Sequence, residues 1–358
     1  MNAPADPNFK IAVYALTIPG LIIAEKICAG LRADLHIPKR LMDKTAYPAK
    51  AFEGFCRHMS GSFFKYQGHV VIAATGLAVR AVAPFVRDKK SDPAVVSLGQ
   101  DGKYAISLLS GHLGGGNDLA RKVAAITGGS PVINTATDIA SKPAMEVVAR
   151  NLGLVVENFA RLPAVSRELS EGGKVPVYDP DLFLLPELAQ WADSFPVLDS
   201  VAAFDPENPA YPKGPSVYVG YRAEALPPEA LALRPPVLSL GVGCHRGLAF
   251  AELEKFLDKV FAEFQIARRS IVILSTVETR VAEPALLELA KSWAIPLITH
   301  SKETLSTVST PNPSQMVFSN IGVSSVCEAA ALLAAKMGPL LVPKQKCKTA
   351  TCAIALLP

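Results

Sequence analysis

The sequence predicts an α/β protein in which two open α/β sheet domains are joined by a smaller, proline-rich middle domain. Short β-rich runs alternate with helical stretches toward both ends of the chain, as in sheets covered by helices. Residues 161–236 hold 13 of the 29 prolines, and proline cannot donate to a sheet ladder, so only short strands are expected there. At 358 residues the chain is long enough for two or three domains. We expect the domains to cover 1–138, 139–234 and 235–358.

In the first domain, short apolar runs predict the strands Ile11–Leu16, Val70–Ala74, Ala94–Leu98, Tyr104–Leu109 and Pro131–Ala136. The third and fourth of these flank Gly99-Gln100-Asp101-Gly102, which indicates a hairpin. A turn is expected at Thr17–Gly20, with helices from Leu21 and over Leu77–Phe85. A further buried helix face is predicted by apolar residues at helical spacing, namely Ala49, Phe52, Cys56, Met59 and Phe63.

The middle domain is expected to contain short strands at Lys174–Val177 and Ser216–Val219. From Pro235 the alternation of strands and helices resumes. The strands expected there are Val237–Leu240, Ile271–Leu274, Pro296–Thr299, Leu340–Val342 and Thr351–Leu356. The expected helices cover Ala249–Phe264 and Ala285–Trp293 and begin again at Ser325, while Gly241–Gly247 is expected to be a loop.

Composition excludes several classes of protein. The net charge is +4, from 36 Lys and Arg against 32 Asp and Glu, so a disordered polyelectrolyte or a strong nucleic-acid binder is not expected. The modest positive balance favours a small anionic ligand. The apolar run Ile11–Ala24 is too short to span a bilayer and follows no basic segment, so we expect a cytoplasmic protein. The six cysteines form no CxxC pair, so neither a zinc site nor a disulfide framework is expected.

The most informative loop is Ser110-Gly111-His112-Leu113-Gly114-Gly115-Gly116-Asn117, which lies between an expected strand and an expected helix. Glycines let the backbone approach a ligand closely, and the first N–H groups of a helix favour anions. The spacing matches neither the dinucleotide fingerprint nor the Walker loop, which disfavours a nucleotide site. The loop is either a ligand site or a tight strand-to-helix turn, and His112 is either functional or structural.

Two other loops in the first domain carry polar residues. Thr75-Gly76 precedes a helix with Arg80 in its first turn, where a cation opposes the helix dipole. Arg80 therefore needs a partner, which is either a ligand carboxylate or an internal acid. Thr135–Asp138 ends another expected strand, and Asp138 is expected to cap the next helix.

The last domain repeats this pattern. Gly241–Gly247 offers backbone donors together with His245 and Arg246. Glu278 and Arg280 lie between an expected strand and helix. Ser325 and Glu328 have the S-x-x-E spacing of a capping box, which competes with a role in a site.

In order and spacing, these loops resemble those of the CbiG family, the cobalt-precorrin-5A hydrolases of anaerobic cobalamin biosynthesis. The resemblance covers nearly the whole chain, and its most specific element is S-G-H-L-G-G-x-N. It is carried by Ala74–Arg80, Leu108–Asn117, Thr135–Asp138, Gly241–Gly247 and Gly322–Glu328. The C-terminal module also resembles CobE. The chain departs from the family pattern at three positions, where Gly116 stands for Ala, Asp118 for Glu and Arg280 for Lys. If the residue at position 280 had to lose a proton during turnover, arginine could not do so.

The resemblance implies that water opens the ring-A acetate δ-lactone of the substrate and that C-20 leaves with its methyl group as acetaldehyde. This needs a base, donors for charge on the lactone oxygens, and an electron sink. The conjugated macrocycle can be the sink and carries the cobalt, so no cofactor and no metal ligand of the protein are expected. The loop N–H groups suit the donor role. His112 is the first candidate for the base, followed by His245 and Glu328.

The remaining residues of the resembling loops are expected to bind the substrate, with Arg80 and Arg246 on its acetate and propionate groups. They are Thr75, Gly76, Arg80, Ser110, Gly111, Gly114, Gly115, Asn117, Thr137, Gly243, Arg246, Glu278, Arg280 and Ser325. The partner implied is a tetrapyrrole, held in a cleft between two domains, with no nucleic acid and no membrane. A non-catalytic corrinoid carrier is the alternative, and the sequence leaves open whether the chain forms a homo-oligomer.

Overall fold

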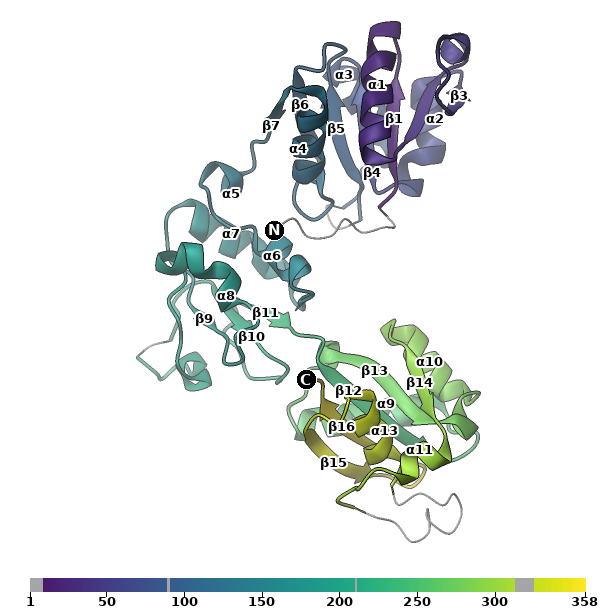
Figure 1. Cartoon of the computed structure of the whole chain (residues 1–358). Helices are drawn as coiled ribbons and strands as arrows, with labels where there is room; N and C mark the ends of the chain where they lie inside the picture. The colour runs from purple at the N-terminus through teal and green to yellow at the C-terminus, as the bar shows by residue number, and fades with distance from the viewer. Residues whose placement is uncertain (1–8, 89–90, 210, 313–324) are drawn as a thin grey trace. The chain divides into compact units, whose positions relative to one another are not determined.

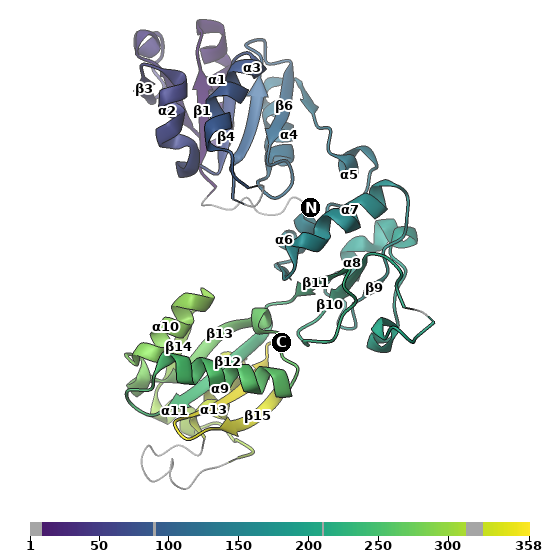
Figure 2. The same ribbon diagram turned by 180° about the vertical axis from the view of Figure 1, so that it is seen from behind.

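The α/β class is confirmed by three sheets covered by helices (Figures 1 and 2). The computed structural model describes residues 9–88, 91–209, 211–312 and 325–358. The chain divides into two compact units, Met1–Val148 with Leu169–Glu171, and Ala149–Glu168 with Gly172–Pro358. Two larger sheets and a smaller one, which lies between them in the sequence, match the expected order of domains. The expected domain boundaries stay a prediction.

The first unit contains a seven-stranded sheet in the order β3-β2-β1-β4-β5-β6-β7. Its strands are β1 (Ile11–Ala15), β2 (Asp34–Pro38), β3 (Ala49–Phe52), β4 (Gly68–Ile72), β5 (Ala94–Leu98), β6 (Tyr104–Leu109) and β7 (Ser130–Val132). The first five run parallel to their neighbours, β6 is antiparallel to β5, and β7 is parallel to β6. The carboxyl ends of β6 and β7 therefore lie at the edge of the sheet where β1, β4 and β5 begin.

Both faces of this sheet are covered, which explains why its strands are apolar on both sides. Helices α1 (Ile18–Leu31) and α4 (Gly116–Thr127) pack on one face, in front of the sheet in Figure 1. Helices α2 (Phe55–Ser62) and α3 (Thr75–Val82) pack on the other face, in front in Figure 2. The short helix α5 (Ala136–Ile139) follows β7, and α6 (Met145–Asn151) comes next.

Most predicted elements of this unit are confirmed, including the hairpin of β5 and β6. The helix over Ala49–Phe63 is wrong in its first half, because Ala49–Phe52 pairs with β2 as a strand, and Cys56 is exposed. The turn at Thr17–Gly20 is also wrong. Thr17 caps α1 by accepting a hydrogen bond from the N–H of Gly20, and proline is tolerated in a first helical turn.

The smaller sheet has the order β8-β11-β10-β9 and is built of β8 (Val155–Val156), β9 (Val177–Tyr178), β10 (Ser216–Val219) and β11 (Ala230–Arg234). The helices α7 (Leu162–Ser170) and α8 (Leu185–Leu188) belong to the same region. Short strands are confirmed, but the expected strand at Lys174 begins only at Val177. The buried strand β11 was not predicted, because prolines flank it closely on both sides.

The five-stranded sheet has the order β14-β13-β12-β16-β15. Its strands are β12 (Leu238–Cys244), β13 (Ile271–Val277), β14 (Leu297–His300), β15 (Leu340–Lys346) and β16 (Ala350–Leu356). Helices α9 (Phe250–Glu263) and α10 (Pro284–Trp293) share one core with it, and α11 (Lys302–Ser306) and α13 (Val326–Ala334) share the other. The loop expected at Gly241 is wrong, because β12 continues to Cys244 along β16.

Within the described ranges, no helix has the length and apolar character needed to cross a membrane. All six cysteines are free, and three of them, Cys28, Cys327 and Cys352, are buried.

Histidines lie in a buried polar and aromatic cluster on the α2–α3 face of the first sheet. His69 contacts the hydroxyl of Tyr14 at 3.1 Å and the carbonyl oxygen of Phe63 at 2.9 Å. The ring nitrogens of His36 and His58 lie 2.7 Å apart. Burial lowers the pKa of His36 to about 3 and that of His69 to about 4, from an ordinary value of 6.5. Both rings are therefore neutral in the folded protein.

We expect the first unit to lose stability as the pH falls below about 6.5, because the unfolded chain then binds protons that the folded chain excludes. The stability is fully present above that pH. Amide hydrogen exchange of β1 and β4 between pH 7 and pH 5 measures the free energy of opening. The substitution His69→Gln should reduce its pH dependence, whereas His245→Gln, at an exposed site, should not. An unchanged slope in His69→Gln would contradict the burial argument.

Candidate functional site

The direction of two neighbouring strands brings together the loops of the main candidate site. Strands β6 and β7 are parallel, so their carboxyl ends meet at one edge of the sheet. The glycine-rich loop Ser110–Gly115 follows β6, and the segment 133–138 follows β7. His112 and Asp138 therefore lie side by side, although they are 26 residues apart.

The glycine-rich loop uses its own carbonyl groups to bind the N–H groups at the start of α4. The N–H of Gly115 donates to His112 O at 3.0 Å, that of Gly116 to Ser110 O at 3.0 Å, and that of Asn117 to Gly111 O at 2.8 Å. The sequence predicts that these groups are available to an anion. For the three residues named, that expectation is wrong, because the tight turn already satisfies them.

Close packing explains why this loop contains glycine. A Cβ atom at Gly114 would lie 2.4 Å from the Cβ of Ser110, and one at Gly116 would lie 2.7 Å from Leu109 O. Gly115 has a φ of 81°, in the left-handed region that favours glycine. Ser110 also has a positive φ, of 53°. The tight-turn interpretation of the glycines is therefore supported, and the turn sets the position of His112.

Asn117 is buried and links the two loops. Its Oδ1 accepts a hydrogen bond from Ser107 at 2.7 Å. Its Nδ2 donates to Asp138 Oδ2 at 3.0 Å and to Thr135 Oγ1 at 3.2 Å. Asn117 was expected to bind the substrate, but these contacts occupy its amide in holding the segment after β7 in place.

Asp138 accepts hydrogen bonds from several side chains and does not cap α5. Besides Asn117, its donors are His112, the hydroxyl of Thr135, and the Arg121 guanidinium at 2.5 Å. Burial raises the pKa of Asp138, but the hydrogen bonds from Thr135, His112 and Arg121 outweigh it and hold the pKa below its usual range. The carboxylate is therefore ionised and fixed in position.

His112 lies between two carboxylates. Its Nδ1 is 3.2 Å from Glu146 Oε1, and its Nε2 is 3.0 Å from Asp138 Oδ2 and 3.2 Å from Thr137 Oγ1. The hydrogen bond to Glu146 is the largest cause that raises the pKa of His112, and the bond to Asp138 adds to it, while burial opposes both. The geometry therefore stabilises a charged ring with a proton on each nitrogen.

Glu146 was not among the residues singled out from the sequence. It lies in the first turn of α6, and it is buried next to Met145 and near Ala149. An acidic residue on the apolar face of a short helix is the signal that could have identified it.

Arg80 and Thr75-Gly76 do not join this cluster. They follow β4, whose carboxyl end lies at the opposite edge of the sheet from the end of β6, because β6 runs antiparallel to β5. Among the described residues Arg80 forms no ion pair, and its guanidinium donates to Gly76 O at 3.3 Å. The two loops therefore lie at opposite edges of the sheet.

In the five-stranded sheet, the loops after β12 and β13 lie at a common edge, because these strands are parallel. His245 and Arg246 are exposed there, and so is Glu278. Arg280 Nε donates to Cys244 O at 2.9 Å, which joins the two loops and leaves its terminal nitrogens for other partners. Gly243 lies within β12 and packs against Thr351.

Glu328 and Ser325 are fully buried. Glu328 accepts hydrogen bonds from the side chain of Asn312 at 2.8 Å and from the N–H of Lys344 at 2.9 Å. The predicted capping box is not formed, because the side chain of Ser325 does not cap α13. The carboxylate of Glu328 instead binds Asn312 and Lys344, which lie before and after α13 in the sequence. These contacts favour a structural role for Glu328 over proton transfer. The preceding residues 322–324 of the resembling segment lie outside the described ranges.

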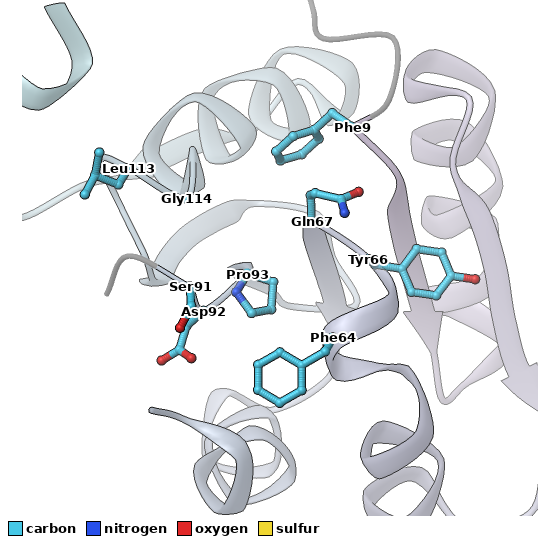
Figure 3. A pocket seen from close by; sticks show the side chains of 9 residues that line it. All are labelled: Phe9, Phe64, Tyr66, Gln67, Ser91, Asp92, Pro93, Leu113 and Gly114. Carbon is cyan, nitrogen blue, oxygen red and sulfur yellow. The ribbon is translucent and has the colours of Figure 1, made fainter. Parts of the chain in front are cut away.

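A cavity of about 220 Å³ opens beside the glycine-rich loop (Figure 3). Leu113 and Gly114 line it together with Phe9, Gln67 and Asp92, which precede β1, β4 and β5. The cavity therefore lies at the same edge of the sheet as His112. It is smaller than the roughly 300–1,000 Å³ of typical ligand pockets, so it suits a substituent of a large ligand, not a whole macrocycle. Within the described ranges, no group of three or more His, Cys, Asp or Glu side chains is arranged so that it could hold a metal ion.

Comparison with known proteins gives consistent matches along the whole chain. Family models described as "Cobalamin synthesis G N-terminal", "Cobalamin biosynthesis central region" and "Cobalamin synthesis G C-terminus" match residues 57–138, 143–235 and 238–355. A "Cobalt-precorrin-5A hydrolase" from Priestia megaterium is 31% identical over 368 residues, covering 100% of this chain and 97% of that protein. A protein of the same name from Salmonella typhimurium is 31% identical over 329 residues, covering 90% and 91%. "Protein CobE" from Sinorhizobium sp is 31% identical over 121 residues, covering 33% and 79%.

Replacing a glycine by alanine should have opposite effects on stability in the glycine-rich loop and in α2. We expect Gly114→Ala to destabilise the first unit by about 1–3 kcal/mol, because the new methyl group would overlap Ser110. Gly61 lies in α2, where an added Cβ atom would meet nothing within 4 Å, so Gly61→Ala should stabilise by about 0.5–1 kcal/mol. Amide hydrogen exchange measures both. Equal stability of Gly114→Ala and the original chain would refute the tight-turn interpretation.

Proposed function

This chain belongs to the CbiG family, and we infer that it is a cobalt-precorrin-5A hydrolase of cobalamin biosynthesis. The full-length likeness to two curated hydrolases supports the activity. The observation that carries the catalytic part of the proposal is the placement of His112 between Asp138 and Glu146. An imidazole held in this way can exchange protons with a bound substrate at a pH near neutrality.

We propose that the substrate's ring-A lactone is opened by water and that C-20 leaves with its methyl group as acetaldehyde. His112 is the proton-transfer group of this scheme. The N–H groups of Gly115–Asn117 are occupied, so other donors would have to stabilise the charge that develops on the lactone oxygens. Thr137 is 3% exposed, and its hydroxyl lies 3.2 Å from His112 Nε2, so it suits holding the ring better than contacting the substrate.

For the substrate's carboxylates, we propose the exposed cations after β12 and β13. Arg246 and Arg280 present guanidinium groups, and His245 lies beside Arg246. Such groups bind carboxylates bidentately, and Arg280 serves as well as lysine in that role because it does not need to lose a proton. Arg80 would meet only a carboxylate that reaches the opposite edge of the first sheet from His112.

The scheme assigns no cofactor to the protein, because the conjugated macrocycle accepts the electrons of the broken carbon–carbon bond and brings its own cobalt. We propose a corrinoid as the small-molecule partner, a cytoplasmic location, and no part for nucleic acid or a membrane. His245 and Glu328, the other candidates for proton transfer, are less suited than His112. His245 is exposed, and Glu328 is fully buried among backbone and amide donors.

A corrinoid carrier without catalytic activity is the alternative function. A carrier needs groups that bind carboxylates but has no use for an imidazole placed between two acids. Anaerobic incubation with cobalt-precorrin-5A separates the two functions. We expect release of one acetaldehyde for each substrate consumed, measured by an aldehyde assay. Binding of the pigment without acetaldehyde would favour the carrier.

The substitution His112→Ala should lower kcat by about 10²–10⁴, the usual range for loss of an acid–base group. KM should change little, because the ring contacts the reacting atoms and not the peripheral carboxylates. Steady-state acetaldehyde release gives both constants. A near-normal kcat would make His112 a structural residue.

A further inference from the structure

Glu146 and Asp138 both hold His112, but their environments differ. The side chain of Glu146 is 11% exposed, whereas those of His112 and Asp138 are 21% and 23% exposed. Glu146, at Nδ1, is therefore the more buried of the two acids, while Nε2 contacts the more exposed Asp138 and the buried hydroxyl of Thr137. A buried carboxylate on Nδ1 also orients the histidine of serine-protease triads, but here Nε2 contacts Asp138 Oδ2 at 3.0 Å as well.

The two acids hold the ring from different elements. Asp138 is anchored by Asn117, Thr135 and Arg121 as well as by His112. Glu146 meets His112 from another element, α6, and fixes the ring from the opposite side. With a carboxylate oxygen at each nitrogen, the ring satisfies both contacts only when it carries two protons. The geometry therefore favours the charged ring, which donates from both nitrogens.

We propose that Glu146 is a positioning residue of this hydrolase: through Nδ1 it orients the ring of His112 and stabilises its charged form, which donates a proton from Nε2. This inference rests on the proposed function. It assigns His112 as the acid of the first step, where the sequence suggested a base, and gives a role to a residue outside the resembling loops.

The proton balance of both steps closes on His112. In the first step, water adds its oxygen to the lactone carbonyl carbon and releases a proton to solvent. The bond from that carbon to the lactone ring oxygen breaks, and this oxygen takes the Nε2 proton. In the second step, the neutral ring takes back the proton of the new hydroxyl on C-20. The O–H electrons form the aldehyde double bond, and the electrons of the broken carbon–carbon bond pass into the macrocycle.

The pH dependence of kcat tests this assignment, because an acid and a base give opposite signs. The charged groups that face His112 are Glu146 on α6 and Asp138 on α5, and Arg121 on α4 faces Asp138. If the charged ring is required, kcat falls as the pH rises through the pKa of His112. Both acids raise that pKa, Glu146 most, so Glu146→Gln should move the fall to lower pH.

We expect Glu146→Gln to lower kcat about 10²–10⁴-fold at neutral pH with KM within about twofold. Glu146→Asp keeps the charge and should restore part of both kcat and the position of the alkaline limb. Glu53→Gln is the matched control, because Glu53 is an exposed acid of the same unit that pairs with Lys39 at 2.6 Å, outside the cluster around His112. It should leave the pH profile unchanged. Thermal melting of each variant checks folding.

Three results would overturn the proposal. A kcat that rises with pH over the same range would make His112 a base. An alkaline limb at the same pH in Glu146→Gln and the original chain would make Glu146 merely structural, even if the melting temperature fell. Both results leave the hydrolase activity intact. Absence of acetaldehyde from the unsubstituted chain would instead overturn the function and the inference together.

Discussion

The reversal of strand direction between β5 and β6 is the constraint on which the site of the first unit depends. Because β6 runs antiparallel to β5, its carboxyl end and that of β7 lie where β1, β4 and β5 begin. The glycine-rich loop and the segment after β7 can therefore exchange side-chain contacts, while Thr75-Gly76 and Arg80 lie at the other edge. A fully parallel sheet would have gathered all of these loops at one edge.

The electrostatics of the cluster follow from this arrangement. The imidazole lies between two carboxylates, and Arg121 is a further cation, which contacts Asp138. Burying two acids without compensation would be unfavourable, so the charged form of His112 is stabilised by the same contacts that fix its position. The glycines contribute by geometry: they permit a turn tight enough to place His112 between the two acids, and they consume the backbone donors in doing so.

The sequence predicted the helices, strands and turns that depend on local pattern. It did not predict features that depend on contacts between residues far apart in the chain. The hairpin at Gly99–Gly102 was predicted from its turn residues, and most strands of both large sheets from their apolar runs. The extended segment Ala49–Phe52 was missed, because its spacing also fits a helix and only pairing with β2 selects the strand. His112 was found through the specific motif around it. Glu146 was not, because nothing in its neighbourhood along the chain shows that α6 returns to the glycine-rich loop.

The protonation state of the His112 ring in the protein without substrate tests most directly whether Glu146 and Asp138 stabilise its charged form. Nitrogen-15 NMR of the histidine side chains, with the signal of His112 assigned by its loss in His112→Gln, reports which ring nitrogens carry protons. At pH 7 we expect both Nδ1 and Nε2 to be protonated, because a carboxylate accepts from each. A neutral ring with one bare nitrogen at that pH would contradict the central claim that Glu146 and Asp138 hold His112 in its charged form.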